Sequence, residues 1–350
     1  MYGFIFRVFF ARMDPELAHT LAFQVIRLLP AIGLGGLVRR FTRPDPALGV
    51  DTLGLHFDSP FGVAAGFDKE GSGVRGLGRL GFGHVEVGTI TALPQAGNEK
   101  PRLFRLIPDR AVINRMGFNN HGAAEAAVVI GKARRRADRP VIGVNIGKSR
   151  VVELDDAIED YLESTRLLAP VADFLAINVS SPNTPGLRGL QDPERLRPLL
   201  AAVKSAAGAV PVLVKISPDL SDDEVTSIAA LSAELLDGII ATNTTLSRSG
   251  LVTPEATVAA AGAGGVSGPP VAARSIEVLR LVRAVVPEEF CVISVGGVET
   301  ADDVAERLAA GATLVQGYTA FLYLGPLWAR QINRGLAARP VAATRTAATR

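Results

Sequence analysis

Six polar side chains stand at or near the ends of short apolar runs, and their types suit the binding of a small polar molecule. They are Lys69, Thr89, Asn145, Asn178, Lys215 and Asn243. A lysine can compensate an anion or attack a carbonyl to form a Schiff base, and an amide can hydrogen-bond the edge of a planar polar ring. Each of these residues alone is also an ordinary turn or surface residue. Their shared position relative to successive runs indicates one common site.

The run NVSSPNT, residues 178–184, is the most distinctive in the chain. It offers amide and hydroxyl groups without charge, which suits a small planar substrate, such as a cyclic imide or ureide, recognised by hydrogen bonds. A plain turn has the same Ser, Pro and Asn content. A second run, NRMGFNN at 114–120, lies in a long segment between two apolar runs and could fold over the site as a lid.

Glycines cluster at three places that suit the binding of a phosphate. Gly296 and Gly297 follow the seventh apolar run, the residues Gly-Tyr-Thr at 317–319 end the eighth, and a third glycine-rich stretch spans 264–268. Glycine lets backbone N–H groups approach an anion closely, and barrel enzymes hold phosphates on the loops after their last two strands. These loops therefore predict a phosphate-bearing cofactor or substrate.

Eight short apolar runs alternate with helix-like stretches from residue 61 onwards. Continuous apolar runs are typical of strands covered on both faces, and strands that alternate with helices build a parallel sheet. Eight such units predict an α/β fold, a (β/α)₈ barrel of the TIM type, which carries its site on the loops after the strands. The runs are residues 61–69, 84–89, 141–148, 174–184, 212–218, 237–245, 291–298 and 314–320. The expected helices are residues 155–168, 193–207, 222–236, 269–286 and 300–310.

The composition limits the classes of protein and of site. The chain has 350 residues and a net charge of +2, so nucleic acid is not expected as a partner. The single cysteine, Cys291, excludes an intrachain disulfide and a cysteine-rich metal site, and its apolar surroundings predict a buried thiol. The four histidines lack the spacing of a zinc site, so no metal is expected.

Residues 1–43 are apolar, basic and helical in their pattern. No stretch reaches the roughly 18 apolar residues that a membrane-spanning helix needs. The positive charges follow the first apolar run, which does not fit a signal peptide. We expect two amphipathic helices, the second capped by Asp14. The first carries Phe6, Phe9 and Phe10, and the second carries Leu17, Leu21, Val25, Leu28 and Leu29 on one face. Such a segment indicates peripheral binding to an anionic membrane surface, with a helical hairpin that caps the barrel as the alternative.

Five segments, in this order, closely resemble the dihydroorotate dehydrogenase family. They are AAGFDK (64–69), NRMGFNN (114–120), NVSSPNT (178–184), Lys215 and ATNTT (241–245). The N-terminal extension and Ser181 resemble class 2, the membrane-associated and quinone-dependent branch, because class 1 members carry cysteine at that position and lack the N-terminal helices. The resemblance spans residues 1–335.

The resemblance implies an FMN-dependent oxidoreductase that converts dihydroorotate to orotate in pyrimidine biosynthesis. Ser181 would remove the C5 proton of dihydroorotate while the C6 hydride passes to the flavin. Thr184 and an ordered water, closed in by Phe118, would then carry the proton away. Lys69 would lie near the substrate carboxylate and the flavin, and Lys215 by the flavin N1 edge, where a cation stabilises reduced FMN.

The other residues that match the family's motifs fall into two sets. The implied substrate contacts are Asn114, Arg115, Met116, Gly117, Phe118, Asn178, Asn183, Asn243 and Thr244. The implied FMN contacts are Ala65, Gly66, Phe67, Asp68, Lys69, Thr89, Asn145, Asn178, Lys215, Thr242, Gly268, Gly297, Tyr318 and Thr319.

The resemblance also implies a second half-reaction with a membrane quinone. The N-terminal helices would form an apolar tunnel for it, with His19, Arg105 and Tyr318 on the polar inner wall. The protein would be a monomer bound peripherally to the cytoplasmic face of the cell membrane. It would comprise a tunnel segment at 1–43, a catalytic barrel at 44–338 and a disordered tail at 339–350.

Three other functions fit part of the pattern. Lys215 at a strand end also suits a Schiff-base aldolase, which needs no flavin. A soluble class 1 enzyme would reduce fumarate or NAD, but Ser181 and residues 1–43 argue against it. A non-catalytic binding barrel would not need the complete set of site residues.

Overall fold

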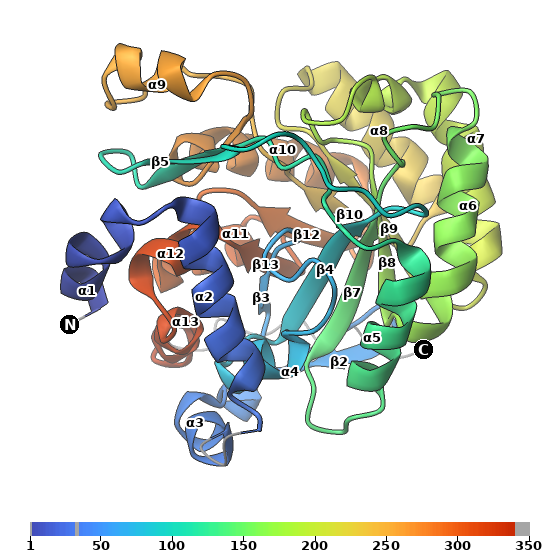
Figure 1. Cartoon of the computed structure of the whole chain (residues 1–350). Helices are drawn as coiled ribbons and strands as arrows, with labels where there is room; N and C mark the ends of the chain where they lie inside the picture. The colour runs from blue at the N-terminus through green and yellow to red at the C-terminus, as the bar shows by residue number, and fades with distance from the viewer. Residues whose placement is uncertain (1, 32–34, 340–350) are drawn as a thin grey trace.

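The computed structural model describes residues 2–31 and 35–339, and its centre is a barrel of eight strands. The strands are β3 Phe61–Val63, β4 His84–Ile90, β7 Val141–Ile146, β8 Phe174–Asn178, β9 Val212–Ile216, β10 Gly238–Ala241, β12 Cys291–Val295 and β13 Leu314–Gly317. All are parallel and close in the order β10-β12-β13-β3-β4-β7-β8-β9, with helices outside (Figure 1). The predicted (β/α)₈ barrel and all eight predicted strands are confirmed.

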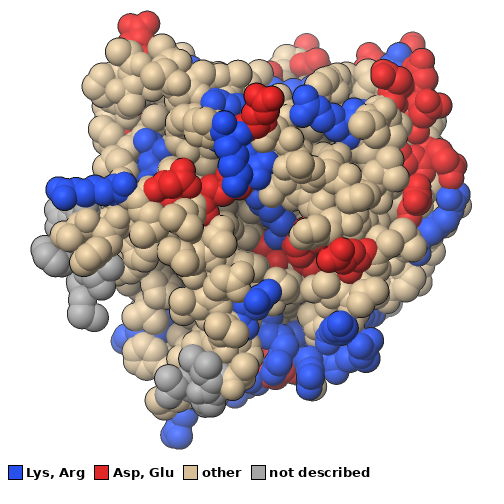
Figure 2. All heavy atoms as spheres, in the orientation of Figure 1, with Lys and Arg blue, Asp and Glu red and all other residues tan. Residues whose placement is uncertain are grey.

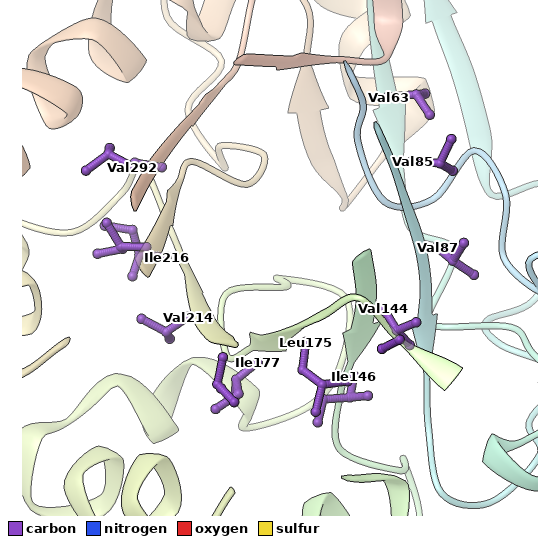
Figure 3. Close-up of a cluster of buried hydrophobic side chains, with 14 of the residues drawn as sticks. Val63, Val85, Val87, Val144, Ile146, Leu175, Ile177, Val214, Ile216 and Val292 are labelled. Carbon is purple, nitrogen blue, oxygen red and sulfur yellow. The ribbon is translucent and has the colours of Figure 1, made fainter. Parts of the chain in front are cut away.

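Each barrel strand alternates between two environments, as extended backbone requires. On β4, Val85 and Val87 pack into the apolar layer between strands and helices, while Glu86 points into the barrel. Figure 3 shows this outer layer, built from valine, isoleucine and leucine of successive strands. The outer helices are α4 Val74–Arg79, α5 Ala123–Arg134, α6 Ala157–Leu168, α7 Pro193–Ala207, α8 Asp222–Leu235, α10 Ala272–Val285, α11 Ala301–Ala309 and α13 Trp328–Ala337. The five predicted helices are among them, with shifts of a few residues at their ends.

A small hairpin closes the barrel at the amino ends of its strands. It is formed by β1 Val50–Thr52 and β2 Leu55–Phe57, and short 3-10 turns connect other elements at Pro46–Leu48, Ala169–Val171, Leu187–Gln191 and Pro269–Val271. Phe57 is fully buried and packs with Phe174 and Cys291 in the barrel interior. The thiol of Cys291 is thus buried, as its apolar run predicted.

A three-stranded antiparallel sheet covers the carboxyl ends of the barrel strands. It consists of β5 Leu103–Leu106, β6 Ala111–Asn114 and β11 Gly265–Ser267, next to the short helix α9 Glu255–Ala261 (Figure 1). We call it the roof sheet. The long segment between the second and third barrel strands supplies its β5–β6 hairpin and then helix α5. Residues 115–120 leave the roof sheet directly over the barrel, which gives the run at 114–120 its place beside the site.

The N-terminal segment forms α1 Tyr2–Val8, the 3-10 turn Phe10–Arg12, α2 Pro15–Leu28 and α3 Gly35–Thr42. Asp14 caps α2 by accepting a hydrogen bond from Leu17 N at 2.8 Å, as predicted. The first helix is shorter than predicted, because it ends at Val8. Phe9 and Phe10, which were expected on this helix, follow it, and Phe10 begins the 3-10 turn. The helix α3 had no counterpart in the prediction.

Helix α2 packs on the barrel with the face opposite to the predicted apolar stripe. Ala18 and Ile26 are buried, and Ile26 packs beside Gly76 of α4. Four residues of the predicted stripe instead face outward, and their side chains are between 47% and 66% exposed: Leu17, Leu21, Val25 and Leu28. The fifth, Leu29, is partly buried against the core. Within 2–31 and 35–339, no helix combines the length and apolar character needed to cross a membrane. The predicted tail lies outside the described residues from residue 340 on.

Candidate functional site

The loops after the barrel strands surround a cavity, which we call the first cavity; helix α2 and the roof sheet also line it. Barrel enzymes place their sites at this end of the strands. Most residues predicted for substrate and cofactor meet here: Ala65, Gly66, Lys69, Thr89, Asn114, Met116, Gly117, Phe118, Asn178, Ser181, Asn183, Lys215, Thr242, Asn243, Thr244, Gly268, Gly297, Tyr318 and Thr319. The structure therefore brings these side chains together, while their individual roles stay predictions.

An ion pair between two barrel strands lies at the floor of the first cavity. Lys215 Nζ donates to the two carboxylate oxygens of Glu86 at 3.2 and 3.1 Å, and the two side chains are 4% and 0% exposed. Strands β4 and β9 are not neighbours, so the pair bridges the barrel interior. Each charge offsets the cost of burying the other. Any molecule in the first cavity thus meets a lysine whose charge is already compensated.

A chain of hydrogen bonds continues from this ion pair along the cavity wall. Asn145 donates from Nδ2 to the carboxylate of the pair at 2.6 Å, and its Oδ1 accepts from Thr89 Oγ1 at 2.6 Å and from Asn178 Nδ2 at 3.2 Å. Asn178 Oδ1 in turn accepts from Ser180 Oγ at 3.1 Å and from Asn243 Nδ2 at 3.4 Å. Because a carboxylate can only accept, it fixes which end of each amide donates. The buried anion thereby orients the amides of the site.

Ser181 lines the first cavity from the loop after β8 and is 5% exposed. Its Oγ accepts a hydrogen bond from Asn183 N at 3.2 Å, which leaves the hydroxyl proton available for another partner. Thr184 is buried outside the cavity lining, and its Oγ1 has no hydrogen-bond partner in the described part of the chain. The two hydroxyls are not directly bonded, so a proton relay between them requires a water.

Phe118 stands beside this loop with its ring against Gly147. A Cβ at Gly147 would lie 2.8 Å from the nearest ring atom of Phe118, so only glycine leaves room for the ring. The ring is partly buried and lines the first cavity. This position suits a side chain that shields the cavity from solvent.

Lys69 enters the first cavity from the loop after β3. Its Nζ donates to Asn119 Oδ1 at 2.8 Å. Burial, followed by repulsion from Arg102, lowers the pKa of Lys69 to about 8. Lys69 is therefore a cation at neutral pH that loses its proton more readily than an exposed lysine.

A second ion pair joins helix α2 to the roof sheet. Glu16 accepts from Arg102 Nη2 at 2.8 Å and from Nε at 3.2 Å, and the Arg102 side chain is only 7% exposed. The hydrogen bond from Arg102 holds the pKa of Glu16 below its usual range. Such a fork-shaped contact fixes orientation as well as distance. It holds the segment of α2 that contributes Glu16 and His19 to the first cavity.

Another part of the cavity wall consists of backbone from glycine-containing loops. Gly268 has φ +99° and Gly297 has φ +71°, a region that favours glycine. A Cβ at Gly297 would lie 2.5 Å from Ala272 Cβ, so this loop packs directly on α10. Thr319 Oγ1 donates to Ser267 Oγ at 2.8 Å beside them. The wall offers backbone groups at close approach, which suits a phosphate.

Arg115, a predicted substrate contact, has its side chain outside the lining of the first cavity. Its guanidinium donates to the carbonyl oxygens of Ala263 at 3.0 Å and Pro101 at 2.8 Å, and lies 4.5 Å above the ring of Phe104. Carbonyl groups beyond the end of α9 need donors, and the five-donor guanidinium supplies them. The side chain thus ties the roof sheet to α9 and does not line the first cavity.

Three predicted cofactor contacts also have side chains outside the lining of the first cavity. Asn145 lies in the network beneath the floor. Asp68 accepts from Gly71 N and Gly73 N, both at 2.8 Å, and burial raises its pKa to about 6. It caps the loop that leads to α4. Phe67 faces away from the first cavity, because its ring packs among aromatic side chains of α2 and the helix after β13.

A second cavity lies between the N-terminal helices, the roof sheet and the helix α12 Thr319–Leu324. Its wall is mainly apolar, with Phe6, Phe10, Ile26, Phe67 and Leu322 among the lining residues. Arg105 also lines it and donates from Nη1 to Met13 O at 2.8 Å. Tyr318, predicted beside Arg105, lines the first cavity instead, with its ring centroid 5.6 Å from that of Phe67.

His19 lines both cavities and so marks where they adjoin. Burial, followed by repulsion from Lys69, lowers the pKa of His19 to about 4. The ring is therefore neutral at physiological pH. Its Nδ1 is buried and has no hydrogen-bond partner within the described residues. A neutral imidazole with a free nitrogen can bond to a carbonyl or hydroxyl group of a bound molecule.

Sequence reasoning missed Glu86 and the pair Glu16–Arg102. A signal for Glu86 existed: in HVEVGT, residues 84–89, the alternation puts His84 and Glu86 on the face opposite to the valines. A carboxylate on an interior face needs a cation, and Lys215 is an interior lysine of the same barrel. No comparable signal existed for Arg102, because its partner lies 86 positions away in sequence.

Comparison with known proteins gives consistent similarities. A family model described as dihydroorotate dehydrogenase matches residues 47–339. The chain is 69% identical over 339 residues to the dihydroorotate dehydrogenase (quinone) of Leifsonia xyli subsp. xyli, covering 97% of this chain and 99% of that protein. It is 68% identical to the protein of the same name from Clavibacter sepedonicus, with 96% and 98% covered. The ligand-free dihydroorotate dehydrogenase structure from Eimeria tenella superimposes with a TM-score of 0.84 at 38% identity, covering 92% of this chain and 94% of that one.

Proposed function

The chain belongs to the dihydroorotate dehydrogenase family, in its quinone-dependent class, and on that premise we propose how its two cavities divide the reaction. The enzyme is a dihydroorotate dehydrogenase (quinone) of pyrimidine biosynthesis. The match extends over nearly the full length, N-terminal helices included, so the aldolase, class 1 and non-catalytic alternatives are set aside. One observation carries the proposal: His19 lines both the first cavity, where the amides and lysines gather, and the apolar second cavity.

The first cavity would hold FMN, the flavin that this flavin-dependent family leads us to expect. Its wall combines two features that FMN needs: glycine backbone at Gly268 and Gly297 for the phosphate, and the buried Lys215 for the ring. A side chain at Gly297 would clash with Ala272, so the loop is built for close backbone approach. When bound, FMN supplies a two-electron acceptor for dihydroorotate and a donor for the quinone.

Dihydroorotate would bind in the same cavity among the amides of Asn114, Asn178, Asn183 and Asn243. These groups match the amide edges of a pyrimidine ring, and the cationic Lys69 matches the substrate carboxylate. Holding the ring in one orientation places its C5–H for proton removal.

Ser181 would take the C5 proton as the hydride leaves C6. A serine hydroxyl is a weak base, so the proton it receives must move on. The buried hydroxyl of Thr184, which has no partner among the described residues, fits a relay through a water, and Phe118 would restrict access of other water. The C5–H bond breaks to give a proton, the C6–H bond breaks to give a hydride, and the C5=C6 bond of orotate forms.

The second cavity would admit the quinone head group. Its apolar wall suits a lipid-soluble molecule, and His19 and Arg105 can donate to its oxygens. The outward face of α2 would rest on the membrane, since Leu17, Leu21 and Val25 are exposed next to the basic residues of this segment. Figure 2 shows that the surface over α2 is largely free of charged side chains.

The full-length purified protein tests this division of the reaction. It should be yellow, bleach when titrated anaerobically with dihydroorotate, and recover its colour on addition of a ubiquinone analogue. Orotate should form in equal amount to the quinol. A colourless protein would contradict the proposal that the first cavity binds a flavin. Turnover with fumarate but not with the quinone analogue would contradict the proposal that the second cavity is the quinone site.

A further inference from the structure

Arg307 on α11 is a buried cation with neutral neighbours. It is 1% exposed, and its Nη1 donates to Ser275 Oγ at 3.0 Å and Ser294 Oγ at 2.9 Å. Its Nη2 donates to the carbonyl oxygen of Gly296, and its Nε is buried without a partner among the described residues. No carboxylate in the described chain lies within ion-pair distance of it, in contrast to Lys215 and its partner.

An uncompensated buried charge is costly, so its presence calls for a reason. The nearest acids, Asp303 and Glu306, lie on the same helix and are engaged elsewhere. Asp303 accepts from Thr300 N at 2.8 Å in a capping box, and Glu306 faces Arg280 at 3.7 Å. Burial lowers the pKa of Arg307 to about 10, which still leaves it charged at neutral pH. The compensating anion is therefore not supplied by a neighbouring side chain.

The position of Arg307 indicates where that anion binds. The carbonyl it holds belongs to Gly296, which lines the first cavity together with Gly297. The two glycines separate the guanidinium from the cavity by one layer of backbone. Because Arg307 is 1% exposed, its positive charge acts on the cavity more strongly than it would across solvent. Two acids line the same cavity, and both are already paired: Glu299 with Arg110 at 2.6 Å and Glu16 with Arg102 at 2.8 Å.

We propose that Arg307 is a positioning residue for a phosphate monoester dianion bound by the Gly296–Gly297 loop. It supplies the positive potential that the loop backbone lacks, and it fixes the loop by holding the Gly296 carbonyl from behind. The proposal rests on the proposed function in one respect, because the phosphate is taken to be that of FMN. Riboflavin carries the same ring without phosphate. Arg307 thus selects for the phosphorylated flavin without touching the ring.

The test compares FMN with riboflavin on the full-length chain after removal of bound flavin, using quenching of flavin fluorescence. Arg307→Gln keeps a donor for the serines but removes the charge, and Arg307→Lys keeps the charge. In Arg307→Gln, the Kd for FMN should rise roughly 10- to 100-fold, as expected for the loss of one charge at an intermediate dielectric. The Kd for riboflavin should change less than about twofold, within the scatter of such effects. Arg307→Lys should restore most of the FMN affinity.

The matched control is Arg166→Gln, which removes the same charge from an exposed site on α6. It should leave both affinities unchanged. Equal weakening of FMN and riboflavin in Arg307→Gln would assign Arg307 a structural role and overturn the proposal, as would unchanged affinity for both. Wild-type protein that binds neither flavin would instead contradict the proposed function. If Arg307→Gln does not fold, the Arg307→Lys variant decides: loss of FMN discrimination over riboflavin, with charge retained, counts against the proposal.

Discussion

Lys215 Nζ lies 3.1 Å from the nearer carboxylate oxygen of Glu86, and both side chains are buried in the barrel interior. The cation expected to stabilise a reduced flavin is thus offset by an anion. This arrangement keeps the floor of the first cavity near neutral. A flavin above it must accept electrons from dihydroorotate and then release them to a quinone, so a strongly positive floor would hinder the second step.

Glu86→Gln should raise the flavin midpoint potential. Without the carboxylate, the positive charge of Lys215 is uncompensated and stabilises the negative reduced flavin more. We expect an increase of about 30 mV or more at pH 6, which corresponds to about 1.4 kcal/mol for a two-electron couple. Breaking the buried pair should also cost about 3–5 kcal/mol of folding stability. Spectroelectrochemical titration measures the potential. Glu86→Asp, which keeps the charge, is the control, and an unchanged potential in Glu86→Gln would refute this role.

Ser181→Ala should slow the reduction of the flavin by dihydroorotate by about 10²- to 10⁴-fold, the usual contribution of a general base. Flavin binding should persist, because Ser181 makes its one hydrogen bond within its own loop, to Asn183 N. Anaerobic stopped-flow absorbance gives the rate. Ser205→Ala, on the exposed side of α7, serves as the control and should reduce at the wild-type rate. A Ser181→Ala enzyme as fast as the wild type would exclude Ser181 as the base.

Orotate affinity should fall as the pH rises through about 8. Burial lowers the pKa of Lys69 to about 8, so the cation is present below that pH and lost above it. The orotate carboxylate then loses its counter-charge, and its Kd increases. Perturbation of the flavin spectrum by orotate between pH 6 and 9.5 measures this. In Lys69→Met the Kd should be high at every pH; a wild-type Kd that stays flat across the range would show that Lys69 does not bind the carboxylate.

The barrel was predictable because its signals are local. Each strand is a continuous apolar run, and each run ends in or near a polar residue such as Lys69 or Asn178. The order of the strands, and the end of the barrel that carries the site, can therefore be read from the sequence. The orientation of α2 was not predictable from its own sequence, since an apolar helix face can pack either on the barrel or on an external apolar surface. Here Leu21 and Val25 face outward, and Ala18 and Ile26 are buried on the other face.

Long-range charge pairs were beyond local patterns for the same reason. Glu86 and Lys215 are 129 positions apart, and only the closed barrel brings them together. The side chain of Arg115 lies outside the first cavity, although its motif position suggests a substrate contact, because a carbonyl oxygen beyond α9 accepts from its guanidinium. Side chains with several donors go where acceptors are unpaired, and sequence does not reveal which acceptors those are.

Glu16→Gln should impair the quinone half-reaction more than the reduction by dihydroorotate. The Glu16–Arg102 pair fixes α2 against the roof sheet, and α2 supplies His19 to the wall between the cavities. A looser helix should raise the KM for a ubiquinone analogue several-fold, consistent with the loss of about 1–3 kcal/mol for a hydrogen bond to a charged group. Steady-state and single-turnover rates separate the two halves. Equal losses in both would point to general destabilisation instead.

The outward face of α2 should bind membranes through its apolar side chains. Leu21 and Leu28 are 47% and 51% exposed, and burying one such side chain in an apolar phase contributes about 1.5–3 kcal/mol. The double variant Leu21→Ser, Leu28→Ser should therefore bind vesicles of phosphatidylcholine and phosphatidylglycerol at least tenfold more weakly in a sedimentation assay. Reduction by dihydroorotate should not change, because neither side chain lines the first cavity.

The control is the double variant Val128→Ser, Val151→Ser, which removes a similar exposed apolar area away from α2. Val128 lies on α5 and is 58% exposed, and Val151 lies in the loop after β7 and is 77% exposed. If membrane binding came from surface hydrophobicity in general, both double variants would lose it to the same degree. Binding through α2 predicts a loss only in the first. The same contrast should appear in turnover with a long-chain quinone embedded in vesicles, and it should vanish with a short-chain water-soluble analogue, which needs no membrane to reach the second cavity.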